Sequence, residues 1–141
     1  MGALKPGFER DFGGASMNPQ TLLLRQIHPS FVQAGRVTSQ AFRPTPKDEN
    51  HLSVYDGDRI APQAAWHHFT ANPACRSAGV MALAHEECAA LALPVHADGI
   101  PFPEHCSIDF SGFEKKEIEK MAKILSMQAQ QRGWQFGPVL E

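Results

Sequence analysis

The feature that most constrains the fold of this sequence is an amphipathic segment at residues 111–132. Ser111 and Glu114 have the S-x-x-E spacing of a capping box, which predicts that a helix begins at Ser111. Gly133 is placed to end that helix, and Trp134 is expected to fold back onto its last turn. Apolar side chains recur on one face, at Ile118, Met121, Ala122, Leu125 and Ala129. A helix with one apolar stripe needs a second layer to cover it, so the preceding segments are expected to build a sheet.

Five segments before this helix have the length and the residue types of β-strands. Residues 21–27 are mostly apolar and end at a His-Pro pair, which favours extended backbone. Residues 36–42 and 52–55 contain β-branched or alternating residues, and residues 106–110 alternate between polar and apolar side chains. Residues 78–83 are almost wholly apolar, which predicts a central strand of the sheet.

Two short helices are predicted between these strands. Pro62 suits a first helical turn, and Asn72-Pro73 stops the first helix. Residues 85–93 are rich in alanine and leucine, and Pro94 ends the second helix. Loops, rather than crossover helices, join most of the strands. The sequence therefore predicts an α+β fold, with a mixed or mainly antiparallel sheet of about five strands packed by the C-terminal helix and by one or two short helices.

Length and glycine and proline content predict one domain. A chain of 141 residues is long enough to bury one core without disulfides or metals. Residues 1–20 are rich in glycine and proline and have no apolar period, so they are expected to form a flexible tail. Residues 21–136 then form a single α+β domain, and residues 137–141 form a short C-terminal tail.

Charge, hydropathy and cysteine content exclude several classes of partner. A formal net charge of −2 provides no general field for nucleic acid, which is therefore not an expected partner. The longest apolar runs, residues 78–84 and 88–95, are much shorter than a membrane span. The odd number of cysteines and the lack of an apolar leader indicate a reducing compartment, so we expect a cytoplasmic protein with no membrane association.

Histidine and cysteine content raises the question of a metal site. His85 and Cys88 lie three residues apart on a predicted helix and can point to the same side. The other two ligands would have to come from His105 and Cys106, or from His67 or His68. Adjacent residues on a strand face opposite ways, so His105 and Cys106 do not chelate together. We therefore predict no metal site and no cofactor, with the cysteines as small buried hydrophobic residues.

Basic and hydroxyl side chains cluster in residues 25–59. Arginines such as Arg25 and Arg43, next to hydroxyl groups, suit a phosphate-bearing ligand. Carboxylates in the same stretch nearly cancel the positive charge, so local ion pairs are the alternative. The chain has neither G-x-x-x-x-G-K-[ST] nor G-x-G-x-x-G, and it has no complete catalytic motif. The catalytic residues therefore stay unknown at the level of sequence.

Several short motifs resemble a pattern that recurs in a family of small uncharacterised bacterial proteins. The motifs are LLRQIHP at 23–29, SQAFRP at 39–44, LSV at 52–54, PEH at 103–105 and RGW at 132–134. The resemblance covers most of the chain and implies a bacterial origin and a single compact domain. Together with the basic cluster, it directs attention to six ligand-binding candidates, which are Arg25, His28, Ser39, Phe42, Arg43 and His105.

A second, weaker resemblance is to the NAD-consuming ADP-ribosyltransferases and RES-type toxins. In these families an arginine-bearing strand precedes small hydroxyl residues, and Arg25, Ser39 and Tyr55 would take those parts here. The catalytic glutamate of a late strand has no counterpart, because Asp109 is the acidic residue within residues 106–110. The resemblance implies NAD chemistry only at the level of the fold.

Two hypotheses about function follow. Size, near-neutral charge and the lack of a complete site favour a small bacterial binding or interaction protein of the immunity or antitoxin kind, with a protein partner or with self-association. The alternative is a nucleotide- or NAD-using enzyme built around Arg25 and Ser39, with His28 or His105 transferring protons. The hypotheses differ in whether these four side chains form a pocket.

Overall fold

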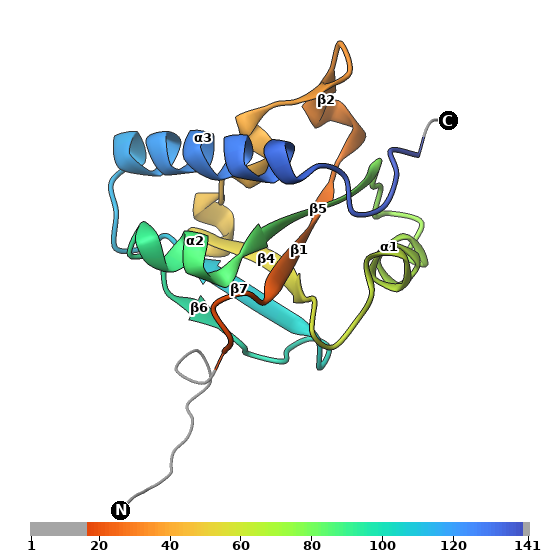
Figure 1. Cartoon of the computed structure of the whole chain (residues 1–141), viewed down its shortest axis with the longest axis horizontal. Coiled ribbons are helices and arrows are strands. Elements are labelled where there is room, and N and C mark those ends of the chain that lie inside the picture. The colour runs from red at the N-terminus through yellow and green to blue at the C-terminus, as the bar shows by residue number, and fades with distance from the viewer. Residues whose placement is uncertain (1–16, 140–141) are drawn as a thin grey trace, which may run out of the picture.

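A five-stranded sheet forms the centre of the molecule (Figure 1). The computed structural model describes residues 17–139, and its strand order is β5-β1-β4-β7-β6, with every neighbouring pair antiparallel. The strands are β1 (Leu22–Ile27), β4 (His51–Asp56), β5 (Gly79–Ala84), β6 (Val95–His96) and β7 (His105–Asp109). The predicted α+β class is confirmed, and of the two predicted sheet types the structure has the antiparallel one.

One face of the sheet is covered by α3 (Lys115–Arg132), which runs across it in Figure 1. Four residues of the predicted apolar stripe are buried against this face, namely Ile118, Ala122, Leu125 and Ala129. Met121 is half-buried at the border of the same core. Gly133 has a φ of 91° and ends the helix as predicted, and Trp134 packs back against the core. The amphipathic helix and its covering layer are therefore confirmed.

The start of α3 differs from the prediction. The helix begins at Lys115, and Glu114 rather than Ser111 is the N-cap residue. The Glu117 carboxylate accepts a hydrogen bond from the Glu114 N–H over 3.0 Å, which is the backward half of a capping box. Ser111 does not cap the helix because its N–H and its hydroxyl both donate to the Asp109 carboxylate, over 2.8 and 2.6 Å.

The opposite face of the sheet is covered at one end by α1 (Pro62–Thr70), which packs on β1 and β5. Ala65 of this helix contacts a second core that contains Leu24 and Val80. The short α2 (His85–Ala90) follows β5 directly. Both short helices agree with the prediction, although α2 ends earlier than expected. Towards β4 and β7 the same face of the sheet carries polar side chains.

The segment predicted as a strand at residues 36–42 is divided into two elements. They are β3 (Arg36–Val37), paired with β2 (Val32–Gln33), and a 3-10 helix, η3 (Ser39–Phe42). Ala41 and Phe42 are neighbours and both are fully buried. This suits a helical turn, because adjacent residues on a strand point to opposite faces. Two further 3-10 helices are η2 (Pro29–Phe31) and η4 (Pro46–Asp48).

The apolar strand predicted to be central, β5, stands first in the sheet order. Its six residues are nevertheless buried, because α3 and α1 both pack on it. The chain after α3 also lies alongside it: Val80 and Phe136 form an antiparallel bridge, and the Val139 N–H donates to the Ala78 carbonyl. Gly79 permits this approach, since a Cβ there would lie 2.5 Å from the Phe136 carbonyl oxygen.

The predicted tails lie mostly outside the described residues, which exclude 1–16 and 140–141. Met17 packs on the core beneath α3, and the Pro19 carbonyl accepts a hydrogen bond from the Glu86 N–H over 2.8 Å. Contacts with the domain thus begin before residue 21. Within residues 17–139, no helix has the length and the apolar character that crossing a membrane requires.

Candidate functional site

Polar residues alternate with core residues along two neighbouring strands. On β4, Leu52 and Val54 face the α3 core, which turns the residues between them to the opposite face. On β7, Cys106 and Ile108 also face the α3 core, so the residues that alternate with them lie on the opposite face. The strand register then pairs the remaining residues, with His51 opposite Asp109, Ser53 opposite Ser107 and Tyr55 opposite His105. This face of the sheet therefore presents two adjacent rows of hydroxyl and titratable side chains.

Ser53, His105 and Asp98 form a continuous hydrogen-bonded relay on this face. The Ser53 hydroxyl oxygen lies 3.1 Å from Nε2 of His105, and Nδ1 of His105 lies 2.6 Å from a carboxylate oxygen of Asp98. An ionised carboxylate can only accept a hydrogen bond, so in the neutral imidazole Nδ1 carries the ring proton and Nε2 accepts from the Ser53 hydroxyl. In this arrangement a histidine can remove the proton of a serine hydroxyl.

Asp98 is held in place by the loop between β6 and β7. Its second carboxylate oxygen accepts a hydrogen bond from the Ser107 hydroxyl over 2.7 Å. Gly99, at a φ of 63°, turns the chain so that its N–H donates to the His105 carbonyl over 3.0 Å. Burial opposes ionisation of Asp98, but hydrogen bonds from His105 and Ser107 outweigh it and hold the pKa of Asp98 below its ordinary value. The carboxylate therefore stays ionised beside the imidazole.

A cavity of ≈ 400 Å³ opens beside Ser53 and His105. Its walls are largely aromatic and cationic, and they include Phe31, Tyr55, Phe69, Phe102, Arg25 and Arg76. Among the residues of the described chain that line this cavity, none carries a carboxylate. Such walls suit a ligand with an aromatic part and a negative charge.

Tyr55 joins the cavity wall to α1. Its ring stacks on Phe102 with the ring centroids 4.9 Å apart, and its hydroxyl lies 2.8 Å from Nδ1 of His68 on α1. Burial raises the pKa of Tyr55 to about 12, and the charges of Cys75 and Glu104 act in the same direction. Tyr55 is therefore a neutral, hydrogen-bonding part of the wall at neutral pH.

Arg25 lies at the point where β1 and β4 stop pairing. The two strands are paired over two residue pairs, and beyond these pairs the Arg25 side chain connects β1 to β4. Its Nε donates to the Ala41 carbonyl over 2.8 Å, and a terminal nitrogen donates to the Ser53 carbonyl over 3.0 Å. Burial lowers the pKa of Arg25 to about 10, against the opposite effect of Asp48, so the guanidinium is charged at neutral pH. A fixed positive charge therefore lies beside the backbone of Ser53.

Three of the six predicted ligand-binding residues come together. The residues that line the cavity are Arg25, His28 and His105. The other three lie elsewhere: Ser39 in a separate groove between β3 and α3, Phe42 fully buried in the core, and Arg43 directly after η3. The enzyme arrangement predicted around Arg25 and Ser39 thus has its two residues in different cavities.

Neither Ser53 nor Asp98 was predicted from the sequence as a hydrogen-bonding partner of His105. A signal for the two strands is present, since HLSVYD at 51–56 and HCSID at 105–109 share a His-x-Ser spacing. Polar residues with a period of two face the same side when such strands pair. Asp98 lies in a loop, where no periodicity predicts the position of a side chain.

Fold and site together define a small α+β protein with a serine–histidine–aspartate relay beside an aromatic and cationic cavity. No protein-family model, curated protein or solved structure gives a significant match to the chain. The resemblances carried by the short motifs therefore stay predictions.

Proposed function

We propose that the protein is a serine-type hydrolase that cleaves an ester bond in a small molecule with an aromatic part and a negative charge. The observation that carries the proposal is the relay from Ser53 through His105 to Asp98. Ser53 is exposed to solvent, and both Ser53 and His105 border the ≈ 400 Å³ cavity. A molecule bound there reaches the Ser53 hydroxyl without rearrangement of the sheet.

The reaction takes place in two steps at one carbonyl carbon. The Ser53 oxygen attacks the ester carbon while Nε2 of His105 takes the hydroxyl proton. The bond to the alcohol oxygen then breaks, and the alcohol leaves with that proton. Water next attacks the acyl-Ser53 ester, again with His105 as the base, and the carboxylic acid is released. Asp98 stays ionised throughout and stabilises the imidazolium.

The charge of Arg25 supports both the reaction and the substrate class. Its terminal nitrogen donates to the Ser53 carbonyl oxygen over 3.0 Å, so a positive charge is held against the backbone of the proposed nucleophile. Preorganised positive charge stabilises the oxyanion that develops in the transition state. Among the described residues, those that line the cavity include no carboxylate, which favours an anionic group on the substrate.

A fluorophosphonate probe tests the proposal on the full chain, because it reacts covalently with activated serine hydroxyls. One adduct per chain is expected, and peptide mass spectrometry should locate it on Ser53. Ser53→Ala should abolish the labelling. His105→Gln should lower the rates of labelling and of p-nitrophenyl ester hydrolysis by about 10²–10⁴-fold, the usual effect of losing a general base.

The matched control is Ser39→Ala, which removes a serine from the groove between β3 and α3. Labelling and ester hydrolysis should be unchanged in this variant. An adduct on Ser39, or labelling of Ser53→Ala at the rate of the unmodified protein, would contradict the hydrolase proposal.

An interaction protein of the immunity or antitoxin kind is the second candidate, and an apolar pair on α3 supports it. Ile124 and Met127 are 39% and 57% exposed and lie about one turn apart. Such a pair would contact a protein partner or a second copy of the chain. Analytical ultracentrifugation tests whether the chain binds a second copy of itself. The unmodified chain should dimerise and Met127→Lys should stay monomeric. A monomer at every concentration would exclude self-association through this pair.

We also propose that the protein is bacterial and cytoplasmic, as predicted from the sequence. Cys75, Cys88 and Cys106 form no disulfide among the described residues, which supports a reducing compartment.

A further inference from the structure

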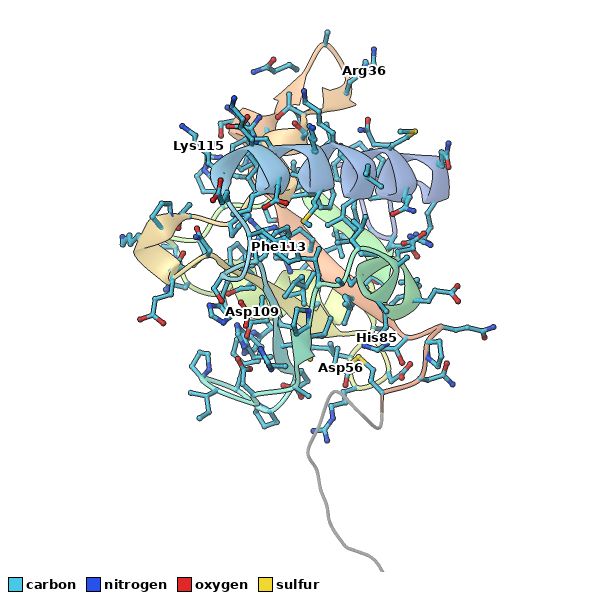
Figure 2. All side chains as sticks on the ribbon, turned by 90° about the vertical axis from the view of Figure 1, so that its left-hand side faces the viewer. Arg36, Asp56, His85, Asp109, Phe113 and Lys115 are labelled. Carbon is cyan, nitrogen blue, oxygen red and sulfur yellow. The ribbon has the colours of Figure 1, made fainter. Side chains whose placement is uncertain are left out.

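We infer that His51, His96 and Asp109 form a binding site for a divalent transition-metal ion such as Zn²⁺. The three residues come from β4, β6 and β7, and one donor atom of each lies within 4.8 Å of the donor atoms of the other two. In Figure 2, Asp109 at the end of β7 lies below Phe113 and Lys115, through which the chain continues to α3. The site goes beyond the proposed ester hydrolysis, whose steps require no metal ion.

The spacing of the donor atoms fits a tetrahedral ion. Oδ2 of Asp109 lies 3.1 Å from Nε2 of His96 and 3.5 Å from Nε2 of His51. Zinc binds nitrogen and oxygen at about 2.0–2.2 Å, which places neighbouring tetrahedral ligands about 3.3–3.6 Å apart. The two distances to Asp109 are therefore within about 0.2 Å of those in a tetrahedral site, and the imidazole donor atoms of His51 and His96, which lie within 4.8 Å of each other, would move closer together on binding.

Hydrogen bonds outside the cluster orient its donor atoms. Nδ1 of His51 lies 3.0 Å from the Glu49 carbonyl oxygen, which can only accept, so Nδ1 carries the proton and Nε2 presents a lone pair. The N–H and hydroxyl of Ser111 both bind Oδ1 of Asp109, which leaves Oδ2 for the two imidazoles. Outer partners of this kind fix the ring tautomer and the carboxylate orientation in metal sites.

The surroundings of the cluster favour a cation and leave it open to solvent. His51 and His96 border a hollow that is also lined by Asp48, Glu49 and Asp98, with Lys47 as a smaller opposing charge. The side chain of His96 is 50% exposed, so the ion would be reached from solvent. Three protein ligands leave a fourth position for water, as in catalytic rather than structural zinc sites, and a bound ion makes such a water more acidic.

The cluster is a neighbour of the relay but does not share its residues. His51 and Ser53 are two positions apart on β4 and face the same side, which places their Cα atoms about 6.6 Å apart. The two sites use different residues but share one hollow, which Ser53, Asp98 and His105 also line, so zinc binding and serine labelling are measured in separate experiments.

Calorimetric titration of the full chain with Zn²⁺ at neutral pH tests the inference. One Zn²⁺ per chain is expected, and the bound ion should raise the melting temperature. His51→Ala and His96→Ala should each raise the Kd at least tenfold, the lower end of the effect of losing a single orienting partner. Mg²⁺ should not compete, because it prefers oxygen ligands.

Two variants serve as controls. His85→Ala removes the histidine of the His85–Cys88 pair considered from the sequence, and it should bind Zn²⁺ like the unmodified protein. Ser53→Ala should lose probe labelling and keep its Zn²⁺ affinity, which separates this site from the proposed hydrolase. Melting curves without metal should show that each variant folds.

Co²⁺ substitution gives a second measurement that needs no variant. Visible bands of tetrahedral Co²⁺ without thiolate charge-transfer bands are expected for two imidazoles and a carboxylate. The inference would be overturned by a lack of stoichiometric binding, by an unchanged Kd in both His51→Ala and His96→Ala, or by a thiolate band, which would assign the ion to a cysteine.

Discussion

Arg25 gives a direct test of how the fold supports the cavity. Arg25→Met keeps most of the apolar length of the side chain and removes two hydrogen bonds, a part-buried one to the Ala41 carbonyl and a more exposed one to the Ser53 carbonyl. A hydrogen bond from a charged donor contributes about 1.5–3 kcal/mol, and an ordinary one about 0.5–1.5 kcal/mol. Arg25→Met should therefore lower the free energy of unfolding by about 2–4.5 kcal/mol.

Urea unfolding followed by tryptophan fluorescence measures this change, with a lower midpoint and an unchanged m-value. The melting temperature should fall by about 4 °C for each kcal/mol. Arg36→Met is the matched control, because Arg36 is exposed on β3 at the top of Figure 2, and it should change the stability by less than about 0.5 kcal/mol. If Arg25→Met unfolded at the midpoint of the control, Arg25 would not hold β1 and β4 together.

Three further predictions concern the thiols, the tyrosine and the chain after α3. At about pH 8 a thiol reagent should react rapidly with Cys75 and not with Cys88 or Cys106, because burial raises the pKa of both of these to about 12; rapid loss of more than one thiol from the native protein would contradict this. Tyr55 is the one tyrosine of the chain, and its pKa of about 12 predicts little phenolate absorbance in the native protein at about pH 11. In the unfolded chain the Tyr55 phenol titrates near pH 10. The stability that comes from the raised pKa of Tyr55 is therefore complete below about pH 10 and is lost as the pH rises towards about 12. A native absorbance midpoint near pH 10 would disprove the burial effect. Gly79→Ala should lower the free energy of unfolding by about 1–3 kcal/mol, because the added methyl group meets backbone and ring atoms of the chain after α3, and an unchanged urea midpoint would show that this segment is not held against β5.

Local periodicity explains which elements could be predicted from the sequence. The apolar stripe of α3 and the alternation in β7 are properties of short stretches of chain, and both are confirmed. The strand predicted at 36–42 is confirmed for residues 36–37 and wrong for residues 39–42, where the alternation is coincidental. Ala41 and Phe42 both enter the core where η3 packs on α3, and that contact is decided by a segment much later in the chain.

The start of α3 shows a different limit of sequence reasoning. Ser111 and Glu114 have the correct spacing for a capping box, but the Asp109 carboxylate competes for the Ser111 hydroxyl. A two-residue turn and a helix cap use the same donor groups, and the sequence pattern alone does not decide between them.

The candidate site was predictable in part. Arg25, His28 and His105 were predicted as ligand-binding residues from the basic cluster and the motif resemblance, and all three line the cavity. The contact between Ser53 and His105 joins residues 52 positions apart, which depends on the pairing of β4 with β7. Asp98 depends on the path of a loop. Chemistry that is assembled from distant strands and a loop leaves no compact motif in the sequence.

The chain after α3 also covers the outer edge of the sheet at β5. β5 is a wholly apolar strand, and on the side away from β1 the Val80 N–H and carbonyl bind the backbone of Phe136 and Gln135. Without this segment, unpaired N–H and carbonyl groups would offer a template on which a strand of another molecule could add. At the other boundary β6 has two residues, too few for such addition. Residues 134–139 thus cover the backbone groups of this edge, and truncation after Gly133 would expose them.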